Sequence, residues 1–347
     1  MAGEAPAAPE GRGVALRELG ELGLIERVRR RLGPPGAGVL VGIGDDAAAV
    51  AWPPGQILLL TTDTLVEDVH FRRATATLRE VGAKAMAVNL SDIAAMGGEP
   101  RFALLALALP GSSTVEDVDE LYGGLLDMAA RYGVELIGGD TCAAPDRIVL
   151  TVTLVGQVDG PPVRRSGAQP RDAILVTGTL GASAAGLAAL ERGPLPVAPA
   201  VAASVQQAHR LPTPRVAEGR LVRVSGAATA MIDLSDGLCT DLGHIAAESR
   251  VGARVRLPAL PVSDATCEVA RVLGEAPWRW AASGGEDYEL LFTAAPGRAA
   301  AVATRVTAET GTPVSLIGEI RPAAEGVVFV DETGRPVDVQ PGFEHFR

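Results

Sequence analysis

The sequence is poor in cysteine, in aromatic residues and in lysine. Its three cysteines, Cys142, Cys239 and Cys267, are widely spaced and form no C-x-x-C pair, so neither a disulfide framework nor a zinc site is indicated and a reducing compartment is expected. The first residues lack the basic and apolar segments of a signal peptide, and the apolar run 102–109 is too short to span a bilayer. We therefore expect a cytoplasmic protein that binds no membrane.

The usual nucleotide-binding motifs are also missing. There is no G-x-x-x-x-G-K-[ST], no kinase glycine-rich loop with H-R-D, and no G-x-G-x-x-G after a strand, so any use of ATP requires a different way of binding phosphate. The net charge of -11 argues against a nucleic-acid surface, but it does not exclude anionic small ligands, because bound divalent ions can invert the local sign. Lys84 is the only lysine, and we attribute this bias to the coding genome rather than to mechanism.

Length and composition predict two domains of the α+β class. A chain of 347 residues with 47% apolar side chains can bury a large core in two domains. Predicted helices and strands mix in both halves without strict alternation, which favours two mixed sheets over a doubly wound fold. We expect a flexible tail over 1–15, a first domain over 16–158, a linker over 159–172 and a second domain over 173–347.

Apolar periodicity and turn residues predict the individual elements. The predicted helices cover 16–31, 78–96, 115–132 and 238–247, with an alanine-rich helix after 178–181. The predicted strands cover 39–43, 57–61, 102–109, 135–137, 148–158, 173–177, 228–232, 290–293, 314–317 and 326–330. The segment 197–207 carries little signal.

Seven aspartates lie at the ends of apolar runs, in five short segments rich in Gly, Ser and Thr. The segments are Gly42-Ile-Gly-Asp-Asp46, Thr61-Thr-Asp-Thr64, Asn89-Leu-Ser-Asp92, Gly138-Gly-Asp-Thr141 and Asp233-Leu-Ser-Asp-Gly237. We interpret each as a hard oxygen ligand on flexible backbone, placed where a buried element meets solvent. One such segment would be an ordinary turn, but five together indicate a cluster of hard cations, and we favour Mg²⁺ that holds a nucleotide's phosphates.

Each segment alone also has a purely structural interpretation. Asp45-Asp46 suits a solvated turn, and Thr62-Asp63-Thr64 suits a helix cap. Asp92 could be a helix-surface acid, although its apolar flanks favour a buried acid beside a cation. Gly138-Gly139 could direct backbone N–H groups toward an anion. The site is indicated by the joint occurrence of the segments rather than by any one of them.

Three further groups are candidates for ligand contact. His70 follows the second acidic segment closely, although a lone histidine is more often structural than functional. The loop Ser283-Gly-Gly-Glu-Asp-Tyr-Glu289 is either a turn before a strand or a means of presenting Glu286 to a ligand. Arg164 and Arg165 are either solvated linker charges or a fork that clamps an ATP phosphate.

Together these segments resemble the thiamine-monophosphate kinase family of the PurM-like ATP-binding superfamily. The resemblance rests on Gly-Ile-Gly-Asp-Asp, Thr-Thr-Asp-Thr-Leu-Val-Glu-Asp-Val-His-Phe, the Asn-Leu-Ser-Asp helix, Ile-Gly-Gly-Asp-Thr, Ile-Asp-Leu-Ser-Asp-Gly-Leu and Ser-Gly-Gly-Glu-Asp-Tyr-Glu-Leu, in family order. It implies two PurM-like α+β domains, of which the N-terminal one forms a homodimer. It also implies ATP-dependent conversion of thiamine monophosphate to thiamine diphosphate with several Mg²⁺ ions.

The resemblance further implies roles for individual residues. Metal-ligand positions are matched by Asp46, Thr61, Thr62, Asp63, Asp92, Asp140, Asp233 and Asp236. ATP contacts are matched by Tyr122, Gly139, Arg165 and Ser235, and positions near the thiamine substrate by His70, Glu286 and Phe343. Phe343 is a departure where Trp or Tyr is also expected, but its ring suffices to stack on a pyrimidine.

The expected chemistry needs no general base. The acceptor is a phosphate monoester with a second pKa of about 6, so it is largely dianionic near pH 7. Metal ions can then screen the two polyanions and align them for direct transfer. Selenophosphate synthetase, a related alternative, would need a reactive cysteine near an N-terminal glycine-rich loop. The related hydrogenase-maturation protein would need a C-terminal cysteine, where this chain reads Glu-His-Phe-Arg. A metal-dependent phosphatase and a non-catalytic nucleotide-binding regulator also stay open.

Overall fold

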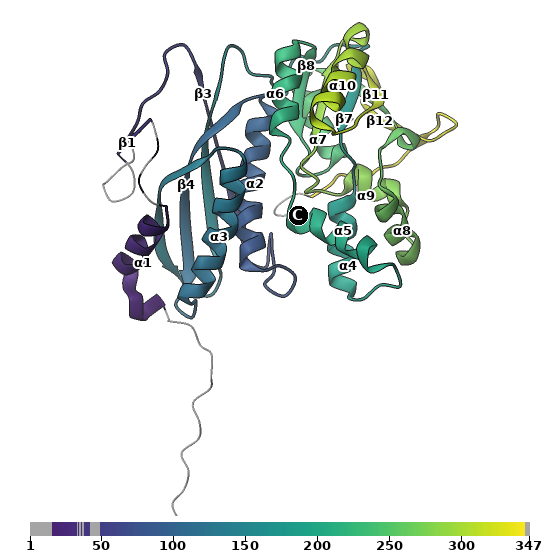
Figure 1. Cartoon of the computed structure of the whole chain (residues 1–347). Helices are drawn as coiled ribbons and strands as arrows, with labels where there is room; N and C mark the ends of the chain where they lie inside the picture. Colours follow the sequence, from purple (N-terminus) through teal and green to yellow (C-terminus); the bar gives the residue numbers. More distant parts are fainter. Residues whose placement is uncertain (1–15, 33, 35, 37, 42–48, 344–347) are drawn as a thin grey trace, which may run out of the picture.

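The computed structural model describes residues 16–32, 34, 36, 38–41 and 49–343. The predicted tail 1–15 and the predicted ligand Asp46 lie outside these residues. The described chain forms two halves that lie side by side, with α2 on the side of the N-terminal half that faces the C-terminal half (Figure 1). Within this part of the chain, no helix is both long and apolar enough to cross a membrane.

The N-terminal half contains a four-stranded sheet. Its elements are α1 (Leu16–Leu32), β1 (Val39–Val41), β2 (Ala49–Val50), β3 (Ile57–Val66), α2 (Leu78–Ala95), β4 (Glu99–Pro110), α3 (Val115–Arg131), β5 (Glu135–Ala144) and β6 (Val149–Val158). The sheet has the strand order β3-β6-β4-β5, in which β4 and β5 pair parallel and the other neighbours pair antiparallel. Strands β3 and β5 are therefore its two edges.

Helices α2 and α3 cover one face of this sheet. Leu105 of β4 and Leu150 of β6 point to that face and are buried with Leu90 of α2 and Leu121 of α3. Because side chains alternate along a strand, the residues between them point to the opposite face. That second face is less completely covered, and Leu60 of β3 is 67% exposed on it.

The C-terminal half contains a seven-stranded sheet in the order β13-β12-β9-β11-β7-β10-β8. Its elements are β7 (Ala173–Thr177), α4 (Ala182–Arg192), α5 (Pro199–Arg210), α6 (Val216–Ser225), β8 (Ala228–Asp233), α7 (Leu238–Ser249), β9 (Val251–Arg256), η1 (Leu257–Ala259), α8 (Asp264–Leu273), α9 (Pro277–Ser283), β10 (Leu290–Ala294), α10 (Pro296–Thr310), β11 (Val314–Pro322), η2 (Ala323–Glu325), β12 (Val327–Val330) and β13 (Pro336–Val337). Strands β12 and β9 pair parallel, and the other neighbours pair antiparallel.

Both faces of the seven-stranded sheet are covered. Ile174 and Val176 of β7 belong to one core cluster, whereas Leu175 between them belongs to another that includes residues of α6 and α10. This alternation shows apolar packing on both sides of the same strand. The strand is accordingly a continuous buried run, as its sequence Ala-Ile-Leu-Val-Thr predicts.

Helix α2 joins the two halves. Its last turn packs on α6, where the backbone of Gly219 lies so close to Ala94 that an added Cβ would come within 2.1 Å of the Ala94 carbonyl oxygen. Ser91 Oγ donates a hydrogen bond of 2.6 Å to Asp233 Oδ2 at the end of β8. The helix that covers the first sheet therefore also positions residues against the second half.

The predicted fold class, two α+β halves with mixed sheets, is confirmed. The expectation that the acidic segments are flexible loops after strands is wrong for two of them. Residues Thr61–Thr64 lie inside β3, which pairs with β6 along its whole length, and Gly139–Thr141 lie inside β5. Threonine favours a pleated strand, and Thr62 and Thr64 form hydroxyl hydrogen bonds with Thr153 and Thr151 across the sheet, at 3.1 and 2.8 Å.

Candidate functional site

The candidate site is a cavity of about 830 Å³ lined by residues from both halves. From the N-terminal half come β3, the turn after it and one side of α2; from the C-terminal half come α4, α5, the end of β8 and the loop 284–288. The described residues that line it include nine of the predicted ones: Thr62, Asp63, His70, Asp92, Asp233, Ser235, Asp236, Glu286 and Phe343. Segments far apart in the sequence therefore meet at one place.

Three acids from three different elements form the centre of the site. Asp63 comes from β3, Asp92 from the last turns of α2, and Asp233 from the end of β8. The backbone N–H of Asp63 donates to Asn89 Oδ1 at 3.1 Å, which fixes β3 against α2. Asp92 accepts a hydrogen bond from the Thr61 hydroxyl. Asp233, which is 3% exposed, accepts the hydrogen bond from Ser91.

The acids repel one another and are poorly solvated. Burial is the largest cause that raises the pKa of Asp63 to about 7, followed by repulsion from Asp92 and Asp233. Burial and repulsion from Asp92 raise the pKa of Asp233 to about 7, against the hydrogen bond from Ser91. Burial also raises the pKa of Asp92, opposed by its hydrogen bonds and by the positive charge of Arg165. A hard cation would remove this repulsion, so the donor set fits Mg²⁺.

A second acidic group adjoins the first. Asp236, Asp241 and His244 offer ligand atoms that all lie within 4.8 Å of one another. However, Asp241 Oδ2 already accepts the backbone N–H groups of Asp236 and Gly237, at 3.2 and 3.0 Å, where α7 begins. Asp241 therefore acts as a cap for this turn, and it holds the backbone of Asp236 at the cavity wall.

The loop 284–288 forms the wall on the side of the C-terminal half. Gly285 is required there, because an added Cβ would lie 2.6 Å from the Ser235 carbonyl oxygen. The Glu286 N–H donates to that same oxygen at 2.7 Å. The next residue, Asp287, accepts the backbone N–H groups of Gly181 and Ser183, at 2.6 and 3.1 Å, where α4 begins. The loop is thus tied to β8 on one side and to α4 on the other.

The remaining predicted substrate residues lie at the same cavity. His70 Nδ1 accepts the backbone N–H of Val66 at 3.1 Å, which sets the ring in the turn after β3. The Phe343 N–H donates to the Asp236 carbonyl at 3.1 Å, and its ring is half exposed. An imidazole, a carboxylate and an aromatic ring therefore line the cavity together with the acid centre.

Five described predicted residues do not line this cavity: Thr61 reaches the site only through its hydrogen bond to Asp92, and the other four lie away from it. Tyr122 is 6% exposed in the core of the N-terminal half, where it hydrogen-bonds with Thr141 and where burial raises its pKa to about 12. Gly139 and Asp140 lie on β5, at the sheet edge opposite β3. An added Cβ at Gly139 would come within 2.0 Å of the Leu105 carbonyl oxygen, so this glycine serves strand packing. Arg165 is exposed and acts on the acids through its charge.

Sequence reasoning missed several residues of the site. Lys84 forms an ion pair with Glu286, His209 lies within hydrogen-bond distance of the same carboxylate, Ser91 binds Asp233, and Tyr288 lines the cavity. One signal for Lys84 is present in the sequence, because a lysine inside the apolar run Val-Gly-Ala-Lys-Ala-Met-Ala-Val is expected to be buried and paired. No comparable pattern surrounds His209.

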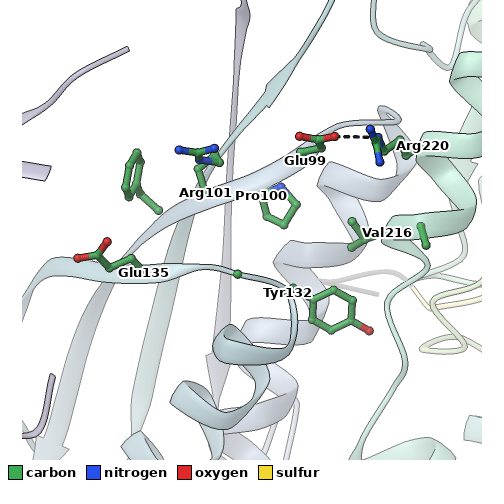
Figure 2. Close-up of a pocket in the computed structure, with 10 residues that line it drawn as sticks. Glu99, Pro100, Arg101, Tyr132, Glu135, Val216 and Arg220 are labelled. Carbon is green, nitrogen blue, oxygen red and sulfur yellow. Dashed lines mark ion pairs between the residues drawn. The ribbon is translucent and has the colours of Figure 1, made fainter. Parts of the chain in front are cut away.

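A smaller hollow of about 490 Å³ lies between the start of β4 and α6. Figure 2 shows Glu99 facing Arg220 there, in an ion pair of 2.7 Å, with Tyr132 near Val216. Glu135 accepts a hydrogen bond from the backbone of Gly36 at 2.7 Å. Because the described residues that line this hollow include no predicted site residue, the larger cavity is the candidate functional site.

Comparisons with known proteins point to one family. Residues 44–158 match the family model of the AIR synthase related protein N-terminal domain, and residues 169–331 match that of the C-terminal domain. The chain is 42% identical over 335 residues to thiamine-monophosphate kinase of Escherichia coli O157:H7, covering 94% of this chain and 98% of that protein. A solved structure of thiamine-monophosphate kinase from Stenotrophomonas maltophilia K279a is 38% identical, with a TM-score of 0.80 over 90% of this chain and 96% of that one. The structure of AaThiL complexed with AMPPCP and TMP is 34% identical, with a TM-score of 0.75 over 97% of this chain and 100% of that one.

Proposed function

The chain belongs to the thiamine-monophosphate kinase family and is a phosphotransferase, and from that premise we propose that it transfers the γ-phosphoryl group of ATP to thiamine monophosphate. The transfer is direct: the new bond to the acceptor phosphate oxygen forms as the bond to the ADP oxygen breaks. A relative solved with AMPPCP and TMP supports both substrates.

The meeting of Asp63, Asp92 and Asp233 carries this proposal. Two of these carboxylates belong to the N-terminal half and one to the C-terminal half, and when they are ionised a bound cation offsets the repulsion among them. Thr61 and Asp236 stand beside them as further oxygen donors, whereas the Thr62 hydroxyl lies on the opposite face of β3 and bonds with Thr153. Mg²⁺ ions held by this set would screen the two phosphates and align them for in-line transfer.

The remaining cavity residues would hold the rest of the two substrates. On the ATP side, Ser235 would offer a hydroxyl from the cavity wall, and Arg165, which lies outside the cavity but acts on the acids through its charge, would offer a charged donor suited to phosphate. His70, Glu286 and Phe343 face the thiamine part, and a half-exposed ring is available for stacking on a pyrimidine. The acceptor phosphate is largely dianionic near pH 7, so no residue need act as a general base.

We also propose a homodimer through the N-terminal sheet. The register places Asp140 in one cross-strand row with Thr64, on the face opposite Asp63 and three strand spacings from β3, roughly 14 Å. One copy therefore does not bring Asp140 to the acid centre. Leu58 and Leu60 leave this face apolar and exposed, as an association surface would be. A second copy docked there could supply Gly139 and Asp140 of its edge strand to its partner's site, whereas Tyr122 of α3 is buried on the covered face.

Product analysis tests the proposed reaction. Purified protein is incubated with ATP labelled in the γ-phosphate, Mg²⁺ and thiamine monophosphate, and the labelled products are separated. We expect labelled thiamine diphosphate, which forms only when metal and acceptor are both present. Label released only as free phosphate would instead support a metal-dependent phosphatase. Stable label on the protein after a single turnover would contradict direct transfer.

A further inference from the structure

Lys84 is buried at the wall of the cavity. It is the only lysine of the chain, and its side chain, on α2 of the N-terminal half, is 4% exposed. Its Nζ lies 2.7 Å from Glu286 Oε1, on the loop 284–288 of the C-terminal half. A buried ammonium group is unfavourable without a partner, so this contact determines where the Lys84 side chain can lie.

His209 holds the other oxygen of the same carboxylate. Its Nδ1, on α5, lies 3.2 Å from Glu286 Oε2 and 3.1 Å from the hydroxyl of Ser183. Each carboxylate oxygen of Glu286 therefore has its own protein partner, one from each half. The side chain still keeps 27% of its surface exposed and lines the cavity, so lone pairs stay available to a ligand.

The backbone of this loop needs such support. Glu286 and Tyr288 both have positive φ values, 66° and 51°, a region that side chains other than glycine disfavour. Strained backbone persists where neighbouring contacts hold it in place. For Glu286 these contacts are the hydrogen bond from its N–H to the Ser235 carbonyl and the contacts of its carboxylate with Lys84 and His209. Removing Lys84 would therefore affect both the charge and the position of the carboxylate.

The charge of Glu286 depends on the same partners. Burial pushes the pKa of Glu286 upward, but the attraction of Lys84 and the hydrogen bond from His209 outweigh burial and lower the pKa to about 2. The group thus stays an anion and can only accept hydrogen bonds. It offers a cavity contact suited to an N–H group or a cationic ring, at a place separate from the phosphate-binding acids.

We propose that Lys84 and His209 are positioning residues that fix the Glu286 carboxylate as the acceptor for the amino group on the pyrimidine ring of the substrate. This inference rests on the proposed function and deepens it, because it assigns specificity for the non-phosphate end of the acceptor to an ion pair that spans the two halves. Lys84 itself does not touch the reacting atoms.

Kinetics of three variants test the proposal. Lys84→Met should raise KM for thiamine monophosphate by about 10-fold or more, while KM for ATP changes less than about 2-fold, since only one substrate uses Glu286. Lys84→Arg, which keeps the charge, should recover part of the loss. The matched control is Arg220→Met, which breaks an exposed pair with Glu99 that also joins the halves, at 2.7 Å, but lies outside the cavity, so this variant should stay close to wild type. Equal increases in both KM values, or no change in either, would overturn the proposal.

A labelling experiment separates this proposal from the proposed reaction. Because Lys84 carries the only side-chain amine, acetylation by an amine-reactive ester can be followed on one peptide by mass spectrometry. We expect slow labelling in the wild type, still slower labelling with added thiamine monophosphate, and faster labelling in Glu286→Gln. Equal rates in wild type and Glu286→Gln would overturn the proposal even if kinase activity is present. Absence of thiamine diphosphate production would refute the proposed reaction, whereas the labelling rates would still report on the ion pair.

Discussion

The two halves of the molecule differ in how completely their sheets are covered. The seven-stranded sheet has apolar clusters on both faces, and its strands β7 and β10 are buried throughout. The four-stranded sheet has helices on one face, an exposed apolar second face, and acids on both of its edge strands. The C-terminal sheet is thus enclosed by its own helices, whereas the N-terminal sheet leaves one apolar face exposed within a single chain.

The difference explains why the predicted ligands separate into two groups. Asp63 and Asp92 stand on the covered side of the first sheet, where α2 brings them against Asp233 of the C-terminal half. Asp140 stands on the open face and meets none of them within one chain. Within one chain the first group therefore meets at the acid centre, and Asp140 does not.

The largest expected effect is on the acid centre. Asp63→Asn should lower kcat by at least about 100-fold, because it removes a charge aimed at the metal-bound phosphates. The same change should raise the melting temperature of metal-free protein at pH 8. The pKa of Asp63 is raised from 3.8 to about 7 in the folded protein, so the folded protein loses stability as the pH rises from about 4 to about 7. At pH 8 the neutral Asn side chain avoids this loss.

Activity assays and thermal melts in a chelator measure both outcomes. The control is Asp68→Asn, an exposed acid five positions later that pairs with Arg147 and should leave activity near wild type. Full activity in Asp63→Asn would contradict a role of the acid centre in phosphoryl transfer.

A complementation experiment tests the second group. Asp140→Asn should lose activity when pure, as Asp63→Asn does. When the two inactive proteins are mixed and allowed to exchange subunits, about half of the dimers are mixed and one of their two sites is intact, so activity should return to about a quarter of wild type. If subunits are shown to exchange and activity still does not recover, Asp140 and Asp63 of different subunits do not share a site.

A smaller expected effect is the release of protons when Mg²⁺ binds to the acid centre. In metal-free protein, Asp63 and Asp233 hold protons below about pH 7, and Mg²⁺ requires the ionised forms. Metal binding near pH 7 should therefore release protons, and the affinity for Mg²⁺ should fall as pH drops below 7. Calorimetry in two buffers of different ionisation enthalpy measures the release. Binding heats that do not depend on the buffer would contradict the raised pKa values.

The smallest expected effect is at the contact between the halves. Ser91→Ala removes the hydrogen bond to buried Asp233 and should lower the free energy of unfolding by about 1 kcal/mol. Activity should fall only a few-fold, because Asp233 keeps its place on β8. Chemical denaturation measures the change, with Ser315→Ala on partly exposed β11 as the matched control. A loss no larger than in that control would mean that the contact adds no stability.

Apolar periodicity predicted the elements with continuous patterns. Helix 78–96 is observed as α2 at Leu78–Ala95, and strand 173–177 is observed as β7. The pattern did not predict that β3 continues to Val66, because the acid Asp63 interrupts it while pairing with β6 decides the strand's length. Helix α5 was missed, since Val197–Gln207 carried no clear period.

Site residues could be predicted where several ligand-type side chains stand close together in the sequence. They could not be predicted where only the fold brings distant residues into contact. Asp63, Asp92 and Asp233 stand in segments whose composition signals ligand binding. Lys84 and His209 belong to the site only because they contact Glu286, which lies far from both in the sequence. The separation of Asp140 from Asp63 likewise follows from strand order, which no local pattern encodes.

The most direct test of the central claim is to locate the metal ions. Crystals of the protein with a non-hydrolysable ATP analogue, thiamine monophosphate and Mn²⁺ in place of Mg²⁺ would be measured near the manganese absorption edge. We predict anomalous peaks between the two phosphates, at about 2.2 Å from a carboxylate oxygen of Asp63 or Asp92 in one half and of Asp233 in the other. Both substrates bound with no anomalous peak at these acids would contradict it.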